Sequence, residues 1–442
     1  MSAYRPYPKY KPSGVEWLGD VPEHWDIMAL RRCLIEHRQG YYTQSAYVDA
    51  GVKLLRITDL RGYGRIDFSE CPRVEELPEL LPFLLKRSDF VFARTGGAGT
   101  FGLVPPISES VAYASYLIRF RFSKNTDSNF LRYFFLSPSF QEPVKKSIHG
   151  GVNQNIHAED IKDQLVNLPP LPEQIQIASF LDRECGKLDA LQAKQERLIE
   201  LLKEKRQALI SHAVTKGLDP NAKLKPSGIE WLGDVPEHWR VCRVKHVAKL
   251  ESGHTPSKTV PEYWEDCNIP WVSLNDTKQL KDVDYITETA LQISELGMRN
   301  SSAHLLPARA VIFTRDATIG LAAITTRPMA VSQHIIAWIC KERLVVPEYL
   351  LLVFYGMASD LERFTAGATL KTIGMPDVNK LSAAIPPLEE QHAIVERIFR
   401  KVQNIDATMA KAERAIALLK ERRSALISAA VTGKIDVRES AV

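Results

Sequence analysis

Three glycines, Gly97, Gly99 and Gly102, have the G-x-G-x-x-G spacing with which a turn after a strand binds the phosphates of a dinucleotide. That chemistry needs a helix directly after the turn, because the helix N-terminus faces the phosphates. Here Leu103-Val104-Pro105-Pro106 follows instead, which is typical of a strand and its end. We therefore predict a glycine-rich β-turn without a nucleotide.

Two histidines, His24 and His238, recur in the same Pro-Glu-His-Trp string and could serve in acid–base catalysis. No nucleophile stands near either string, so we interpret both as packed, hydrogen-bonded corners. The tryptophans interpreted as core anchors are Trp17, Trp25, Trp231 and Trp239. The sequence has no H-E-x-x-H string, no phosphate-binding loop and no C-x-x-C pair. This pattern favours a protein that binds and positions over an enzyme, with no metal and no cofactor.

A further set of side chains could contact nucleic acid. Arg, Asn, Gln and Lys read base edges, while Ser, Thr and Lys bind phosphates. Such residues gather in loops before the first clear strand of each half, at strand ends and near later polar segments. The candidates are Tyr41, Tyr42, Thr43, Gln44, Arg94, Thr95, Lys145, Lys146, Gln154, His254, Thr255, Ser257, Lys258, Asn275, Arg315 and Lys371. No basic stripe accompanies them, so solvated loops are the alternative interpretation.

The elements that must position these residues form an internal repeat. Residues 11–25 read KPSGVEWLGDVPEHW and residues 225–239 read KPSGIEWLGDVPEHW, with one difference between Val15 and Ile229. A second match aligns PPLPEQ from Pro169 with PPLEEQ from Pro386, and it continues to LLKEKRQALISHAVT and LLKERRSALISAAVT. Each unit therefore has a similar head, a divergent body and a similar tail, as expected for duplication of a whole domain.

Both tails have the pattern of long helices. Pro172 suits a first helical turn, and Gly186 is the only Gly or Pro between it and Gly217. Apolar residues at heptad spacing predict that the tails pair as an antiparallel coiled coil. The predicted contact residues are Leu181, Leu188, Leu191, Leu198, Leu202, Leu209, Ile398, Ile405, Ala415, Leu419 and Leu426. The alternative is that each tail packs on its own body.

Both bodies have short apolar runs separated by Gly and Pro, which predict β-rich α+β domains. The runs correspond in order: 89–94 and 102–107 match 310–315 and 320–326, and 116–122 matches 334–340. Short helices are predicted at 129–136 and 348–357. The predicted division is a head at 1–25, a body at 26–168, a helix at 169–216, a linker and second head at 217–239, a second body at 240–385 and a helix at 386–433.

Composition limits the class of protein. Apolar residues make up 45% and charged residues 25% of the 442, which is ordinary for a globular protein. The 57 basic and 53 acidic side chains leave a net charge of +4, which excludes a histone-like polycation. The N-terminal residues lack an apolar signal region and no apolar run is long enough to span a membrane. Together with six scattered cysteines, these features predict a cytoplasmic protein.

The combined motifs resemble the specificity subunit of Type I restriction-modification systems. The resemblance rests on the head PSGxEWLGDVPEHW, the stretches GHTPSK…IPWVSLND, TRDATIGLAAI and GATLKTIGMPD, and the tail PPLxEQ…LLKExRxALIxxAVT. It covers both units in the right order. The first unit departs from it, with GYYTQS in place of GHTPSK and VKLLRITDL in place of IPWVSLND. Contact residues therefore do not transfer from one body to the other.

The resemblance implies a non-catalytic chain with two α+β target-recognition domains, each followed by a long helix. Each domain would read one half of an interrupted, asymmetric target in double-stranded DNA, and the coiled coil would set the spacing. The implied partners are two modification subunits, which bind S-adenosylmethionine and methylate adenine, and restriction subunits with motor and nuclease activity. The shared heads and tails are the predicted partner interface.

Two other functions compete with this one. The chain could be a coiled-coil scaffold whose bodies bind proteins and never contact DNA, or a self-sufficient enzyme with unfamiliar motifs. Salt-dependent, sequence-selective DNA binding would distinguish a specificity subunit from such a scaffold. Methyl transfer by the purified chain alone would support the second.

Overall fold

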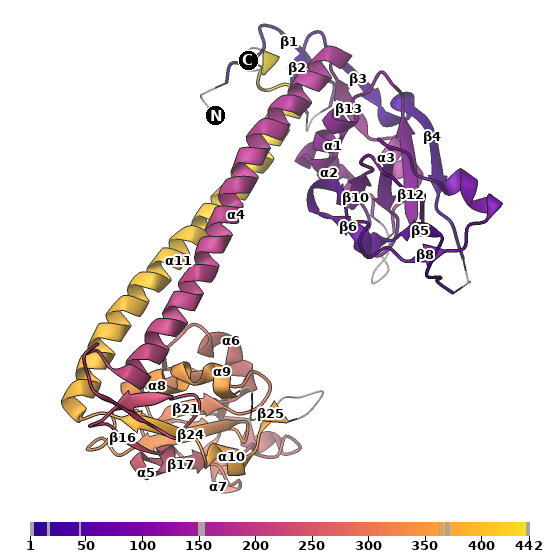
Figure 1. The fold of residues 1–442 in the computed structure, drawn as a ribbon. Coiled ribbons are helices and arrows are strands. Elements are labelled where there is room, and N and C mark those ends of the chain that lie inside the picture. The colour runs from indigo at the N-terminus through magenta and orange to yellow at the C-terminus, as the bar shows by residue number, and fades with distance from the viewer. Residues whose placement is uncertain are drawn as a thin grey trace. The chain divides into compact units, whose positions relative to one another are not determined.

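The computed structural model describes residues 4–15, 18–43, 46–148, 155–361, 363, 365–366 and 372–438. The chain forms two compact units, of which the first contains Met1–Glu196 and Arg414–Val442 and the second contains Arg197–Glu413 (Figure 1). The C-terminal end of the chain thus belongs with the N-terminal body. None of the helices in the described part combines the length and apolar character that a membrane span needs.

A four-stranded antiparallel sheet organises the first body, with the strand order β10-β9-β12-β4. Its strands are β4 (Leu34–Gln39), β9 (Phe90–Ala93), β10 (Phe101–Leu103) and β12 (Leu117–Phe122). A smaller sheet contains β11 (Val111–Tyr113), β5 (Val52–Leu55) and β8 (Arg73–Val74). The helices α1 (Ser128–Leu136) and α2 (Pro138–Lys146) bury phenylalanines against β9 and β10; Phe135 lies 4.9 Å from Phe90 and 5.2 Å from Phe92 between ring centroids.

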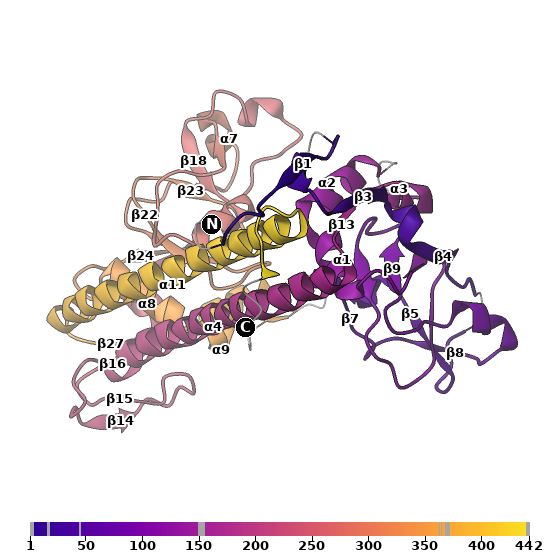
Figure 2. The same cartoon turned by 90° about the horizontal axis from the view of Figure 1, so that it is seen from above.

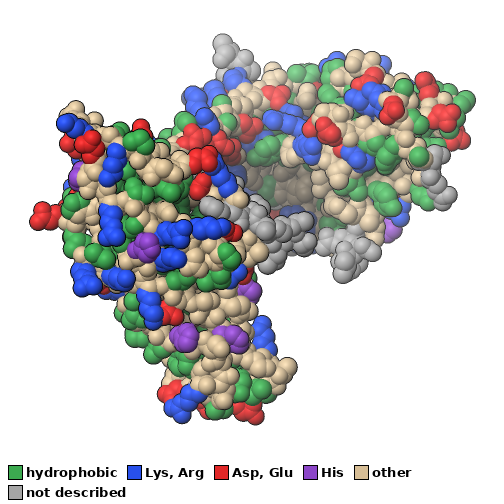
Figure 3. Space-filling model, turned by 60° about the horizontal axis from the view of Figure 1, so that its bottom comes forward, with side chains coloured by type: hydrophobic (Ala, Val, Ile, Leu, Met, Phe, Trp, Pro, Cys, Tyr) green, Lys and Arg blue, Asp and Glu red, His purple; other side chains and the backbone are tan. Residues whose placement is uncertain are grey.

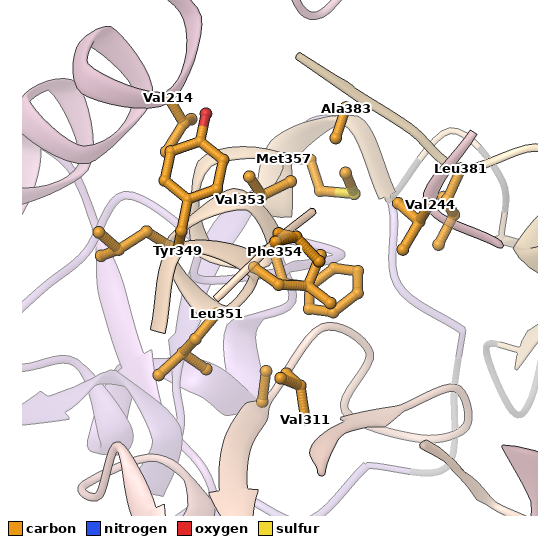
Figure 4. Packing of buried hydrophobic residues seen from close by; sticks show 14 of the residues in the cluster. Val214, Val244, Val311, Tyr349, Leu351, Val353, Phe354, Met357, Leu381 and Ala383 are labelled. Carbon is orange, nitrogen blue, oxygen red and sulfur yellow. The ribbon is translucent and has the colours of Figure 1, made fainter. Parts of the chain in front are cut away.

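The second body repeats this plan, and its sheet has the order β17-β24-β21-β22-β19. Its strands are β17 (Ala248–Ser252), β19 (Tyr285–Ile286), β21 (Val311–Thr314), β22 (Ala322–Thr325) and β24 (Ile335–Cys340). A second sheet contains β18 (Ile269–Val272), β20 (Leu291–Ile293) and β23 (Ala330–Val331). The helix α8 (Pro347–Gly356) packs on β21 and β22, and Figure 4 shows its Tyr349 and Phe354 among the aliphatic side chains of this core.

The equivalence of the two bodies that the sequence predicts is confirmed by this topology. Four strands occupy the same places, since β10, β9, β12 and β4 correspond in order to β22, β21, β24 and β17. The predicted short helices are α1 and α8, each within one residue of its expected ends. The α+β fold class is likewise confirmed.

The two tails are the long helices α4 (Leu171–Lys216) and α11 (Leu388–Val431), of 46 and 44 residues. In each unit they run antiparallel side by side (Figures 1 and 2). The predicted pairing is therefore confirmed, and the alternative holds as well, because both helices also enter the cores of the bodies. In the first unit Leu181 of α4 and Ile427 of α11 lie in one cluster with the sheet phenylalanines.

Two of the predicted contact residues are exposed. Leu181, Leu188, Ile398 and Ile405 are buried, but Leu191 and Leu198 are 47% and 38% exposed. Their neighbours Gln192 and Ile199, each one position further along α4, are less exposed, as is Gln195. Heptad spacing therefore does not distinguish the exposed leucines from the half-buried positions beside them. The remaining predicted contact residues are half-buried, namely Leu202, Leu209, Ala415, Leu419 and Leu426.

Each head joins its tail through one glutamate. Glu173 of α4 accepts hydrogen bonds from Trp25 Nε1 at 3.0 Å and Tyr7 Oη at 2.7 Å, and its other oxygen lies 2.8 Å from His24 Nε2. Its equivalent in the second unit is Glu390 of α11.

Glu390 accepts from Trp239 Nε1 at 3.1 Å and lies 2.8 Å from His238 Nε2. The prediction of a packed, hydrogen-bonded corner is confirmed, and Trp25 and Trp239 are core anchors at 0% and 1% exposure. Trp231 is half-buried against the second core. Trp17 lies outside the described residues.

The next residue joins tail to body in the same way. Gln174 accepts a hydrogen bond from the backbone N of Asp127, just before α1, and donates to the backbone O of Pro169. Gln391 accepts from the backbone N of Val346, just before α8, and donates to the backbone O of Pro386. The shared Glu-Gln pair of the tails is therefore a structural joint between head, tail and body.

An arginine at equivalent positions links the paired helices in each unit. Arg423 of α11 donates to Asp189 of α4 at 3.2 Å, and its guanidinium carbon lies 3.6 Å from the ring centroid of Tyr63. In the second unit Arg206 of α4 pairs with Asp406 of α11 at 3.3 Å and lies 5.7 Å from the ring centroid of Tyr355.

Candidate nucleic-acid interface

The candidate site of the second body lies where the ends of β17, β21 and β24 meet. The loop after β17 passes close to β23, where the backbone N of His254 donates to the backbone O of Val331 at 3.1 Å. Gly253 makes this approach possible, because a Cβ at that position would collide with the same carbonyl oxygen. The residues after β21 and before β24 lie side by side, since the backbone N of Arg315 donates to the backbone O of His334 at 3.0 Å.

Side chains from these segments form a continuous chain of hydrogen bonds. Thr255 donates to Gln333 Oε1, and Gln333 Nε2 lies 3.1 Å from His334 Nε2. His334 Nδ1 lies 2.7 Å from Asp316 Oδ2, and Thr372 donates to the other oxygen of that carboxylate. The chain connects the loop after β17 to β26 (Thr372–Ile373). Two of the predicted residues therefore lie at this site. Thr255 belongs to the hydrogen-bonded chain, and Arg315 is joined to His334 through its backbone.

The equivalent site of the first body has the same backbone and different side chains. Gly40 again allows a close approach, because a Cβ there would collide with the carbonyl of Ala114. The backbone N of Arg94 donates to the backbone O of Tyr116 at 2.8 Å, as the backbone N of Arg315 does to the backbone O of His334. Thr95 occupies the place of Asp316 and donates to Asn155 Oδ1. Tyr116, in the place of His334, is 58% exposed.

Several other predicted residues have clear positions. Tyr42 is 66% exposed, whereas Tyr41 donates to Glu79 at 2.6 Å, a hydrogen bond that raises the pKa of the tyrosine above its ordinary value. Lys145 and Lys146 are exposed at the end of α2, and Lys145 lines a groove of about 340 Å³ with Arg61 and Gly99. The glycine-rich turn connects β9 to β10 and no helix follows it, which confirms the predicted β-turn.

In the second body the loop residues rest on two tryptophans. The carbonyl oxygens of His254 and Ser257 accept from Trp271 Nε1 at 3.2 Å and Trp264 Nε1 at 3.1 Å. His254, Ser257, Lys258 and Asn275 are exposed. Among the described residues, Asn275 forms no side-chain hydrogen bond to the Gln333 chain. Gln44, Gln154 and Lys371 lie outside the described residues.

Sequence reasoning missed the residues at the centre of both sites, which are Gln333, His334, Tyr116 and Asn155. One signal was available. Residues 116–122 align with residues 334–340 in the repeat, so Tyr116 and His334 occupy equivalent positions. Figure 3 shows Lys and Arg interspersed with Asp and Glu over the visible face, in agreement with the near-neutral composition. Within the described ranges no group of three or more His, Cys, Asp or Glu is arranged to bind a metal ion.

Comparisons with known proteins agree on one family. The model for the Type I restriction modification DNA specificity domain matches residues 80–201 and 236–416. A type I restriction enzyme specificity subunit of Methanocaldococcus jannaschii, MjaX, is 23% identical over 95% of this chain and 96% of its own length.

Two solved structures share the fold. A chain from a type I restriction-modification system has a TM-score of 0.73 at 19% identity and covers 94% of this chain and 99% of its own. The HsdS subunit from Thermoanaerobacter tengcongensis has a TM-score of 0.53 at 18% identity, with coverage of 94% and 98%. The chain belongs to the Type I restriction-modification specificity family and is the non-catalytic DNA specificity subunit of such a system.

Proposed function

We propose that residues 26–168 and 240–385 are two recognition domains, each of which reads one half of an interrupted, asymmetric target in double-stranded DNA. The observation that carries the proposal is the pair of equivalent sites at the strand ends. The same backbone hydrogen bonds position Arg94 and Arg315, but the neighbouring side chains are Thr95 and Tyr116 in one body and Asp316 and His334 in the other. Unlike side chains on one frame suit unlike half-sites.

The helix pair would set the spacing between the half-sites, and the shared heads and tails would bind two copies of one partner. The heads and tails suit that role because they repeat the same Glu-to-Trp and Gln-to-backbone joints in both units. Two near-equivalent surfaces are what two identical subunits require. The partners would be modification subunits that bind S-adenosylmethionine and methylate adenine, joined by restriction subunits with motor and nuclease activity. Phosphate contacts from the partners would supplement the modest charge of this chain.

A methylome tests the proposal. The chain is co-expressed with its modification subunit in a methylation-free host, and modified adenines are mapped by long-read sequencing. We expect an interrupted, asymmetric motif that is absent when either gene is omitted. Methylation by the modification subunit alone, or a palindromic motif, would contradict the proposal.

The loop glycines provide a sharper test within each half. Gly253→Ala and Gly40→Ala place a methyl group against a backbone carbonyl that cannot move aside, so each should displace the recognition loop of its own body. We expect methylation at the native motif to fall by about fivefold or more for each variant, since losing even one base-pair contact costs about 1–3 kcal/mol. Partner binding, measured by co-purification, should be unchanged.

Gly186→Ala is the matched control for these two variants. Gly186 lies in α4 and a Cβ there meets nothing within 4 Å. Alanine is the better helix former, so this variant should retain full methylation and gain up to about 1 kcal/mol in stability. Full methylation by Gly253→Ala or Gly40→Ala would show that the loop does not contact the target.

A further inference from the structure

Gln333 presents its amide from the second recognition domain in a fixed orientation. The residue is exposed, two positions before the start of β24, yet both ends of its amide are engaged by neighbours. Asp316 begins the chain of contacts that fixes it, and Asp316 is 8% exposed. Its carboxylate accepts from Thr372 and from His334 Nδ1.

The direction of each hydrogen bond follows from that carboxylate. An ionised carboxylate only accepts, so the tautomer of a neutral His334 that fits this contact has its proton on Nδ1 and an accepting Nε2. The Gln333 atom 3.1 Å from this Nε2 must then be the donating Nε2 of the amide. The amide oxygen consequently faces Thr255, whose hydroxyl donates to it. The amide of Gln333 cannot turn over without breaking both contacts.

Among the residues that the structure describes, none occupies the second donor or the second acceptor of this amide. Nε2 has a second N–H and Oε1 has a second lone pair, and both are available on the exposed side of the side chain. In the major groove adenine offers an acceptor at N7 beside a donor at N6, which complements such a pair. Guanine offers two acceptors, while cytosine offers a lone donor and thymine a lone acceptor. Among the four bases taken singly, adenine alone satisfies both groups.

We propose that Gln333 reads an adenine in the half-site of the second recognition domain, with Thr255 and His334 as positioning residues that fix which strand carries it. The inference rests on the proposed function. The adenine is distinct from the methylated one, because a base that undergoes chemistry leaves the stack. The first recognition domain does not share this reading, since Ser115 and Tyr116 occupy the equivalent positions.

The methylome of co-expressed variants tests the assignment. We expect Gln333→Ala to accept any base at one position of one half-site, where the native motif has adenine. Gln333→Glu replaces the donor by a second acceptor and should favour cytosine there. Gln279→Ala, an exposed glutamine on α6 (Thr277–Leu280) of the same body, is the matched control and should leave the motif unchanged.

The positioning role has its own readout. The double variant Thr255→Val with His334→Ala frees the amide to rotate, so A·T and T·A should both be methylated at that position while G·C remains excluded. The other half-site reports that the complex is folded and active, and its bases should be unchanged in every variant. An unaltered motif in Gln333→Ala, or relaxation at a position that is not adenine, overturns the inference. A native chain that yields no interrupted motif would overturn the proposed function instead.

Discussion

Glu173→Ala should lower the free energy of unfolding of the first unit by about 2–6 kcal/mol, because it leaves two buried donors unpaired at about 1–3 kcal/mol each. Those donors are Trp25 Nε1 and the hydroxyl of Tyr7, and the Glu173 side chain that accepts from both is itself only 8% exposed. Burial raises the pKa of Tyr7, and the hydrogen bond to Glu173 raises it further. The Tyr7 hydroxyl therefore remains protonated throughout the usual pH range, and it still lacks an acceptor when Glu173 is replaced by alanine.

The second unit supplies the matched control. Glu390→Ala removes the equivalent carboxylate, but that side chain is 27% exposed against 8% for Glu173, and it accepts from one buried donor, Trp239. The expected loss is about 1–3 kcal/mol. Calorimetry resolves the two effects, and hydrogen exchange at Trp25 and Trp239 assigns each to its unit. Equal losses in the two variants, or no loss in Glu173→Ala, would show that the head is not anchored through this carboxylate.

Local patterns in the sequence were sufficient for most of the fold. The strands β9, β12, β21 and β24 consist largely of Val, Ile, Leu and Phe between turn residues, so their positions follow from composition alone. The long helices follow from the near absence of Gly and Pro. Which residues of the helix pair are buried does not follow from the pattern, because the exposed Leu191 and Leu198 fit heptad spacing as well as the buried Leu181 and Leu188 do.

Long-range partners could not be predicted from one sequence. In the sequence Asp316 lies 17 residues before Gln333 and 56 residues before Thr372, and only the fold brings the three into one hydrogen-bonded chain. Another example is the set of chain segments that make up the first unit. Tyr10 near the N-terminus donates to the backbone O of Gly433, so the first head packs against the end of the last helix. A head-to-tail repeat gives no indication that its outer ends meet.

The arginines that link the helices lead to the second large effect. Arg423→Met should destabilise the first unit by about 2–4 kcal/mol, because the partly buried Asp189 carboxylate loses its 3.2 Å partner and keeps a longer ion pair, of 3.8 Å, with the exposed Arg65. The Arg423 side chain is 9% exposed and that of Asp189 is 28% exposed, so water relieves part of the cost. Losing the contact with Tyr63 adds to the cost in stability, since the backbone of Tyr63 has a left-handed φ of 66° that the contact with Arg423 helps to maintain.

A double-mutant cycle distinguishes an ion pair from mere packing. Asp189→Leu combined with Arg423→Met should recover most of the loss, because a buried pair replaced by apolar side chains is close to neutral. Arg423→Lys should recover little, since a lysine lacks the planar group that stacks on Tyr63 while it donates to Asp189. Additive losses in the double variant would assign the effect to packing alone.

The equivalent change in the second unit, Arg206→Met, should cost less than about 1 kcal/mol, because exposed ion pairs contribute little. Arg206 is 29% exposed and Asp406 is 46% exposed. Burial raises the pKa of Asp406, and nearby Asp284 raises it too, while Arg206 lowers it. Without Arg206 the carboxyl can take up a proton more easily, which further limits the cost. The same residue pair thus anchors the helices in one unit and contributes little in the other, and urea unfolding of the two variants measures that difference directly.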